Sequence, residues 1–103
     1  MLSFKEFKKV NLRAATITSV EDHPSADKLY VLNIDLGSEE RQMVAGLRQK
    51  YTKEQLKGRQ VIVVVNLEPR ELRGIRSEGM LLAAEDGTIL EPSLKVPNGS
   101  KIM

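Results

Sequence analysis

The feature that most constrains the fold is the apolar run Val-Ile-Val-Val-Val at residues 61–65. β-Branched side chains lose conformational freedom in a helix but pack well on a pleated sheet. A continuous run of them, without polar alternation, is typical of a strand that is buried on both faces. The run therefore predicts a fully buried strand over residues 59–66, which other segments of the chain must cover.

Four further segments have the composition and the flanking turn residues of strands. They are residues 10–22, 28–37, 40–46 and 79–85. The short connection between the second and third of the five strands predicts an antiparallel pair. Asp86-Gly87 is a hairpin turn signal, and residues 88–90 are expected to form a short return strand after it.

Two short helices are predicted from capping boxes, in which a hydroxyl and a later Glu or Gln satisfy the first free amides of a helix. Ser-x-x-Glu at 3–6 begins a helix over residues 2–9, and Thr-x-x-Gln at 52–55 begins one over residues 51–58. Five strands with one internal helix between strands 3 and 4 is the element order of an OB-fold. We therefore expect an all-β, five-stranded OB-fold barrel with an N-terminal helix and a C-terminal extension over residues 92–103.

Such barrels bind oligonucleotides on the face of strands 2 and 3 and with the loops that join strands 1–2 and 4–5. In this chain those loops are residues 21–27 and 67–78, and the second holds three arginines: Arg70, Arg73 and Arg76. Guanidinium groups on a loop fixed between two core strands suit phosphate binding. The alternative is a solvated loop in which Glu68, Glu71 and Glu78 pair with the arginines.

Composition excludes several other classes of protein. The chain has 103 residues, 41% of them apolar, which indicates one domain over residues 1–103 with one core. It has no cysteine, which excludes disulfides and thiolate metal sites and suits a cytoplasmic protein. No apolar stretch is long enough to span a membrane, so no membrane partner is expected. The net charge is only +2, but residues 41–76 hold nine bases and three acids.

Side chains around the basic loop have structural as well as functional interpretations. Asn66 ends a buried strand, so its amide pins the loop or contacts a ligand, and pinning is favoured. Ser77 either caps a turn or binds phosphate. Met80 either packs in the core, which is the commoner role, or lines an apolar pocket for an unstacked base. His23, the single histidine, is expected to shape a turn with Pro24 rather than to bind a metal.

Catalytic chemistry is not indicated. There is no Ser-His-acid set and no glycine-rich phosphate loop at a helix start, so we expect a non-enzymatic protein without a cofactor. The chain has two tyrosines and two phenylalanines, too few for a generic single-strand binder that stacks bases on aromatic rings. Scarce aromatics with available arginines favour recognition of the backbone of a folded RNA.

Four stretches and the closing residues carry a resemblance to a known family. They read N-L-R-A-A-T-I at 11–17, H-P-S-A-D-K-L at 23–29, V-A-G-L-R at 44–48, N-L-E-P-R-E-L-R-G-I-R-S-E-G-M-L-L-A at 66–83 and V-P-N-G-S-K-I at 96–102. On these stretches the chain resembles the tRNA-binding domain family. That module occurs as a C-terminal domain or β-subunit of methionyl-tRNA synthetases and in free-standing tRNA-binding proteins. The resemblance implies an OB-fold and binding of tRNA by shape and phosphate backbone.

The candidate tRNA-binding residues combine motif positions with bases of the 41–76 segment. They are Lys28, Arg41, Arg48, Asn66, Arg70, Arg73, Arg76, Ser77 and Met80. The resemblance itself supplies Asn66, Arg70, Arg73, Ser77 and Met80, with Lys28 on the bordering face. Glu68 and Glu71 stand where many members of the family carry a base. A weaker positive charge on this loop is therefore expected.

The resemblance is compatible with three roles. The first is a tRNA-binding module, free-standing or partnered with the catalytic chain of methionyl-tRNA synthetase. The second is a chaperone-like, peptide-binding homodimer, suggested by the weakened loop charge and by the nearby apolar residues Met43, Ile75 and Met80. A cytokine-like or assembly role is less favoured, because relatives with such roles carry extra segments. A homodimer is expected because the helix bearing Phe4 and Phe7 and the tail at residues 92–103 are apolar elements beyond a complete barrel, and because the resemblance implies homodimers among free-standing relatives.

Overall fold

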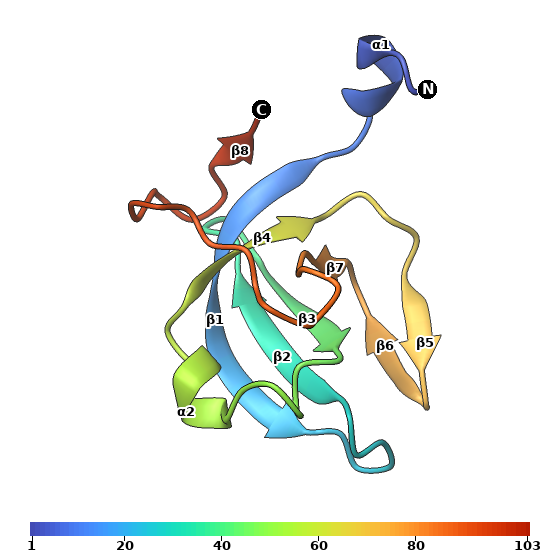
Figure 1. Ribbon diagram of the computed structural model, residues 1–103, viewed down its shortest axis with the longest axis vertical. Coiled ribbons are helices and arrows are strands. Elements are labelled where there is room, and N and C mark those ends of the chain that lie inside the picture. The colour runs from blue at the N-terminus through green and yellow to red at the C-terminus, as the bar shows by residue number, and fades with distance from the viewer.

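The structure is a computed structural model that describes all residues 1–103 (Figure 1). Its two short helices are α1 (Phe4–Phe7) and α2 (Lys53–Leu56). Its strands are β1 (Leu12–Asp22), β2 (Tyr30–Asp35), β3 (Glu40–Ala45), β4 (Gln60–Val64), β5 (Arg70–Leu72), β6 (Ile75–Ser77), β7 (Met80–Leu81) and β8 (Lys101–Ile102).

Five strands form an antiparallel sheet in the order β3-β2-β1-β4-β7, and this sheet curls into a nearly closed barrel (Figure 1). The long strand β1 pairs with β4 along its first half and with β2 along its second half. Between β3 and β7, the gap is bridged just before β7, where the Glu78 amide donates to the Gln42 carbonyl over 2.8 Å. The α2 helix lies between β3 and β4. The predicted OB-fold is therefore confirmed.

The barrel interior is the hydrophobic core. Inward-facing side chains alternate along β2, where Tyr30, Leu32 and Ile34 are buried. In β4, four of the five residues are buried, including Val61 and Val63. The β-branched run thus lies where its composition requires, in a strand covered on both faces.

The C-terminal extension is part of the sheet. Strand β8 pairs with β1 on the edge that β2 leaves free, with Leu12 opposite Ile102. Just before β8, the Gly99 amide donates to the Ala14 carbonyl over 2.7 Å. A Cβ atom at Gly99 would lie 2.4 Å from the Leu36 carbonyl oxygen, so only glycine lets the tail approach the barrel this closely. The extension expected at residues 92–103 therefore ends as an additional strand.

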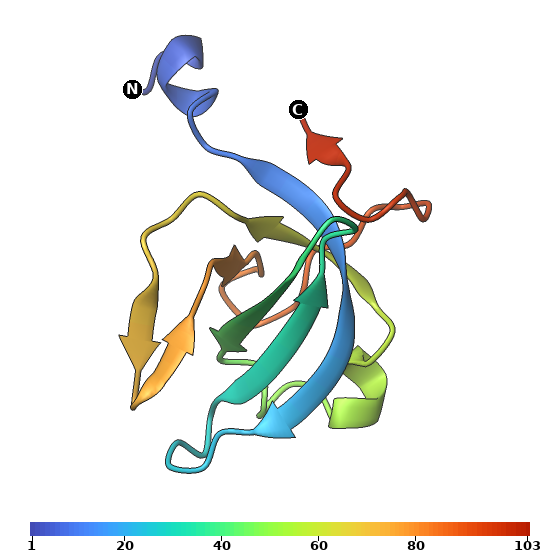
Figure 2. The same ribbon diagram turned by 180° about the vertical axis from the view of Figure 1, so that it is seen from behind.

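Both predicted capping boxes are present, although each helix is shorter than expected. Helix α1 buries none of its residues and projects away from the barrel, as the two opposite views show (Figures 1 and 2). A helix this short is marginal by itself in water. Neither helix is long and apolar enough to cross a membrane.

Three expectations about residues 67–90 are wrong. Residues 67–78 are not an irregular loop, because β5 and β6 pair within them as a two-stranded hairpin. The following strand, β7, has only two residues, and the return strand expected at residues 88–90 is reduced to a single bridge between Ala83 and Ile89. The sharp entry into β7 depends on Gly79, which has φ +134°. A Cβ atom there would lie 2.6 Å from the Met43 methyl group and 2.7 Å from the Val64 carbonyl oxygen.

Candidate nucleic-acid interface

The arginine hairpin, residues 70–77, is built on a two-residue turn. Arg73 (φ 52°) and Gly74 (φ 90°) both have left-handed backbone conformations, as a tight hairpin turn of the type I′ class requires. Glycine adopts this conformation without cost, but Arg73 does so at about 1 kcal/mol. The sequence lacks the Asn-Gly or Asp-Gly pair that usually signals such a turn, which is why the hairpin was not predicted.

The strand register separates the three arginines. Arg70 lies opposite Ser77, and Glu71 lies opposite Arg76. Because successive residues of a strand point to opposite faces, Arg70 and Arg76 project from opposite faces of the hairpin, with Arg73 at its tip. Arg70, Arg73 and Arg76 are all exposed. The hairpin thus presents one guanidinium group on each side and one at the end.

The tip of the hairpin is fixed to the loop at residues 23–27, which joins β1 to β2 (Figure 2). The Arg73 guanidinium donates to the Ser25 carbonyl over 3.0 Å, and the Ser25 hydroxyl donates to the Arg73 carbonyl over 3.4 Å. The His23 ring contacts the Leu72 carbonyl at 2.9 Å. These bonds join the two loops that an OB-fold uses for oligonucleotides, and Lys28 is exposed just beyond them.

Within residues 41–76, ion pairs neutralise most of the bases that lie outside the hairpin. Five of the nine bases in residues 41–76 form the five ion pairs of the structure: Arg41 with Glu39, Arg48 and Lys53 with Asp22, Lys50 with Asp86, and Arg59 with Glu91. None of the hairpin arginines pairs with Glu68, Glu71 or Glu78, so the alternative of a self-neutralised loop is wrong. Three of the four bases that remain unpaired therefore lie on the arginine hairpin.

Three of the predicted site residues are engaged in holding the barrel together. The Asn66 amide accepts from the Asn11 amide at 2.8 Å and donates to the Lys9 carbonyl at 2.6 Å, so it pins the entry into β1 rather than the hairpin. The Arg41 guanidinium donates to the Val65 carbonyl at 2.6 Å. Arg48 donates to the carbonyl of Ala26 at 3.3 Å, which supports the 23–27 loop from its other side.

Ser77 and Met80 have different environments. Ser77 is buried, and its hydroxyl accepts from the Val44 amide at 2.9 Å and donates to the Gly79 carbonyl at 3.0 Å. Met80 is 46% exposed rather than in the core. It lines a small, mostly apolar depression of about 60 Å³ at the base of the hairpin, together with Val44, Leu67, Leu72 and Arg70. The commoner role expected for Met80, packing in the core, is therefore wrong, and the pocket-lining alternative describes its position.

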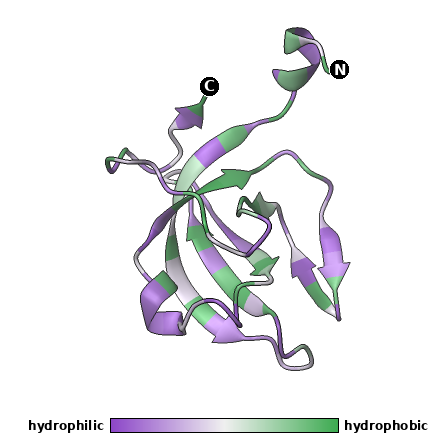
Figure 3. Cartoon of the chain, in the orientation of Figure 1, coloured by the Kyte–Doolittle hydropathy of each residue, from purple (hydrophilic) through white to green (hydrophobic).

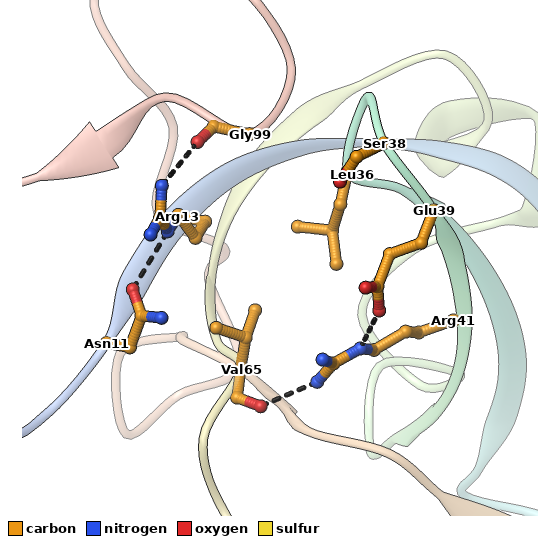
Figure 4. Close-up of a pocket in the computed structure, with 8 residues that line it drawn as sticks. All are labelled: Asn11, Arg13, Leu36, Ser38, Glu39, Arg41, Val65 and Gly99. Atoms are coloured by element: carbon orange, nitrogen blue, oxygen red, sulfur yellow. Dashed lines mark hydrogen bonds and ion pairs between the residues drawn. The ribbon is translucent and has the colours of Figure 1, made fainter.

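A second pair of arginines faces an open pocket of about 230 Å³ at the end of the barrel where β8 joins β1 (Figure 4). Arg13 donates to the Asn11 side chain at 2.8 Å and to the Gly99 carbonyl at 3.1 Å. Arg41 lies across the pocket in contact with Glu39 and Val65. Both guanidinium groups therefore donate hydrogen bonds that connect separate segments of the barrel.

The outer face of β2 and β3 has the wrong charge for a phosphate backbone. Its outward positions carry Val31, Asn33 and Asp35 on β2, and Glu40 and Gln42 on β3. No lysine or arginine is among them. Colouring by hydropathy shows polar positions along β5 and β6 as well (Figure 3), where the charges include the free arginines. The unpaired arginines of this region therefore lie on the hairpin rather than on the strand 2–3 face.

The sequence interpretation missed the position of His23 and the role of Arg13. Both make their contacts to residues far along the chain: the His23 ring to Leu72, and Arg13 to Gly99. The only local signal at His23 was the following proline, which indicates a turn but not its partner.

Fold and site together define a class: a small antiparallel barrel with a basic hairpin at its rim. Residues 12–101 match the model of the family described as "Putative tRNA binding domain". The chain belongs to this family of tRNA-binding OB-fold domains.

Relatives are found among both long and short proteins. The chain is 52% identical to a methionine–tRNA ligase of Pyrococcus furiosus over 104 residues, which cover 98% of this chain and 14% of that protein. Thus the chain spans about one seventh of the length of the curated relatives it matches. Among solved structures, a MetRS related protein from Pyrococcus horikoshii has 32% identity and a TM-score of 0.89, over 100% of this chain and 98% of that one. The chaperone CsaA from Bacillus anthracis has 34% identity and a TM-score of 0.87, over 100% and 99%.

Proposed function

We propose that this chain is a non-catalytic tRNA-binding module that works in the cytoplasm and contacts the phosphate backbone of folded tRNA with its arginine hairpin. The observation that carries the proposal is the charge distribution. The arginines of the hairpin are exposed and free of ion pairs, whereas the bases of β3, of α2 and of the segments beside them are mostly neutralised by acids. Each phosphate that a guanidinium neutralises releases counterions and adds to the salt dependence of binding.

Arg70 and Arg76 are the residues to test first. Neither side chain has a hydrogen-bond or ion-pair partner in the protein, so alanine removes a charge without breaking an internal contact. Arg73 is less suitable, because its guanidinium also fastens the hairpin to Ser25. Each single substitution should weaken binding by about 1 kcal/mol and lower the slope of log K against log salt by about one unit.

The assay is a titration of total tRNA at several salt concentrations, with an unstructured RNA of equal length as the comparison ligand. Lys57→Ala is a matched control, because Lys57 is the other base of the 41–76 segment without an ion pair and lies beside α2, away from the hairpin. Its slope should equal that of the unmodified protein. If Arg70→Ala and Arg76→Ala leave both affinity and slope unchanged, the hairpin is not the tRNA site.

Two partners belong to the same proposal. The first is the catalytic chain of a methionyl-tRNA synthetase, to which this module would bring tRNA, because the long relatives carry a similar segment within one polypeptide. The second is another copy of this chain. Leu2, Phe4, Phe7 and Val10 expose apolar surface on and beside α1, and a two-fold partner would cover it. A monomer mass at tens of micromolar would contradict the dimer.

The chaperone-like alternative has no comparable observation in its favour. The likeness to CsaA is about as close as the likeness to the synthetase-related protein, so the fold does not separate the two functions. The apolar depression beside Met80 is small compared with a peptide-binding groove. Binding to a peptide array, together with no preference for folded tRNA, would reverse this conclusion.

A further inference from the structure

A second group of free bases lies at the end of the barrel where α1 and β8 meet β1. Helix α1 leads into the start of β1, and β8 pairs with that same part of β1, so both lie at this end in the two opposite views (Figures 1 and 2). Five bases belong to these segments, and none of them forms an ion pair: Lys5, Lys8, Lys9, Arg13 and Lys101. We call these five residues the α1–β8 basic surface.

Acidic side chains hardly offset the charge of this surface. Glu6 is the only acid in residues 1–20, and residues 92–103 contain none. The Glu6 carboxylate accepts hydrogen bonds from the Ser3 amide and hydroxyl in the capping box of α1. Five bases and one acid leave a formal charge of +4, whereas the three arginines and three glutamates of residues 67–78 cancel. The α1–β8 basic surface therefore carries more net positive charge than the arginine hairpin.

The lysines of this surface are available to a ligand, since all four are exposed. On α1, successive residues are about 100° apart around the helix axis, which places Lys5 on a different side of the helix from Phe4 and Phe7. A second copy of the chain that packs on the two phenylalanine rings would therefore cover a different side of α1 from Lys5.

Arg13 and Lys101 lie at the centre of the surface. They are opposite each other in the β1–β8 pair, so their side chains share one face of the sheet. The Arg13 guanidinium lines the open pocket at this end of the barrel (Figure 4). Its bonds to Asn11 and Gly99 use two of its five N–H donors, and the other three remain for a ligand. A fixed guanidinium beside a flexible ammonium suits a phosphate group, which accepts hydrogen bonds on several oxygens.

Hydrogen bonds also fix this surface next to the hairpin segment. The Asn66 side chain donates to the Lys9 carbonyl at 2.6 Å and accepts from the Asn11 amide at 2.8 Å, which ties the link between α1 and β1 to the end of β4. Asn66 directly precedes residues 67–78, and Arg70 follows only four residues later. The α1–β8 basic surface thus adjoins the base of the arginine hairpin, and one RNA molecule can contact both.

We propose that the α1–β8 basic surface is a second phosphate-binding surface, which contacts the backbone of the same RNA as the arginine hairpin. This inference rests on the proposed function in taking tRNA as the ligand. Attraction of a polyanion from a distance depends on the summed charge of a surface. The α1–β8 basic surface therefore supplies most of that attraction, whereas the hairpin arginines, balanced by as many glutamates, act at closer range.

The test uses Lys5→Ala combined with Lys101→Ala, because neither side chain has a hydrogen-bond or ion-pair partner in the protein. Lys8 is less suitable, since its ammonium lies 5.2 Å from the centre of the Phe4 ring. Binding of total tRNA is titrated at several salt concentrations. The double variant should lose about two units of the slope of log K against log salt, and its affinity at about 0.1 M salt should fall roughly tenfold. An unchanged slope would overturn the proposal.

Lys57→Ala combined with Lys95→Ala is the matched control, because it removes the same net charge from two exposed lysines that form no ion pair. Lys57 lies beside α2, and Lys95 precedes Val96, which bonds to Gln60 at the start of β4. Both are thus away from the end of β4, where α1 is tied. The control should keep the slope of the unmodified protein. If it loses as much slope as the first double variant, binding depends on net charge alone and the proposal is wrong.

Comparison with Arg70→Ala combined with Arg76→Ala separates this proposal from the proposed function. A slope that falls only in the arginine variant supports the hairpin and refutes the second surface, and a slope that falls only in the Lys5 and Lys101 variant does the reverse. If the intact protein shows no preference for folded tRNA, the proposed function fails. The α1–β8 basic surface then still predicts a loss of about two units on the unstructured RNA, and no loss there would refute it as well.

Discussion

Replacing Ser77 by alanine separates a structural role from an RNA-binding role. The Ser77 hydroxyl accepts from the amide of Val44 on β3 and donates to the carbonyl of Gly79 just before β7. It thus spans the one gap in the barrel that no regular strand pairing closes. Ser77→Ala removes both bonds and leaves the Val44 amide without a partner.

The magnitude follows from burial. Ser77 is 4% exposed and Val44 is 8% exposed, so water cannot readily replace the lost hydroxyl. An unsatisfied buried donor costs about 1–3 kcal/mol, and we expect a loss of about 2 kcal/mol in the free energy of unfolding. For a protein of this size, that lowers the urea midpoint by roughly 1 M.

Urea unfolding, followed by circular dichroism, measures the midpoint, and Ser93→Ala is the control. Ser93 is exposed and its hydroxyl has no partner, so its substitution should change stability by less than about 0.5 kcal/mol. The folded Ser77→Ala protein should keep its salt slope for tRNA, because the hydroxyl faces the barrel. An unchanged urea midpoint with a lost affinity for tRNA would refute this reasoning and make Ser77 an RNA contact.

Three other substitutions test contacts that stabilise the barrel. Gly79→Ala should cost roughly 2–5 kcal/mol, from its positive φ and the two short Cβ contacts, and a lower melting temperature would show it. Asn66→Ala should cost about 1 kcal/mol in chemical unfolding without changing the salt slope for tRNA, because its amide bonds only to the backbone before β1. The third concerns Glu91, whose pKa is held below its usual range by the hydrogen bonds from Arg59. The ion pair therefore stabilises the fold above the unfolded pKa of Glu91, and this contribution is lost as the pH falls through the lower, folded value. Because both side chains are more than a third exposed, Glu91→Gln should cost no more than about 1 kcal/mol at neutral pH and nothing in acid, as unfolding at both pH values would measure.

Local chemistry in the sequence predicted most of the barrel. The β-branched run at residues 61–65 specified a buried central strand, since such side chains fit a covered sheet and disfavour a helix. The two capping boxes located both helices, because a cap satisfies amides only three residues away. The motif at residues 66–83 identified the family.

The sequence placed the arginines in one segment but could not say which charges would remain free. Ion pairs such as Arg59 with Glu91 join residues 32 positions apart, so they exist only once the barrel has closed. The same holds for the contact of His23 with Leu72, which are 49 positions apart, and of Asn11 with Asn66, which are 55 apart. Sequence alone therefore determined strands, caps and family, because these depend on near neighbours. The tertiary structure decided which polar groups hold the barrel and which face solvent, because that depends on partners that only folding brings together.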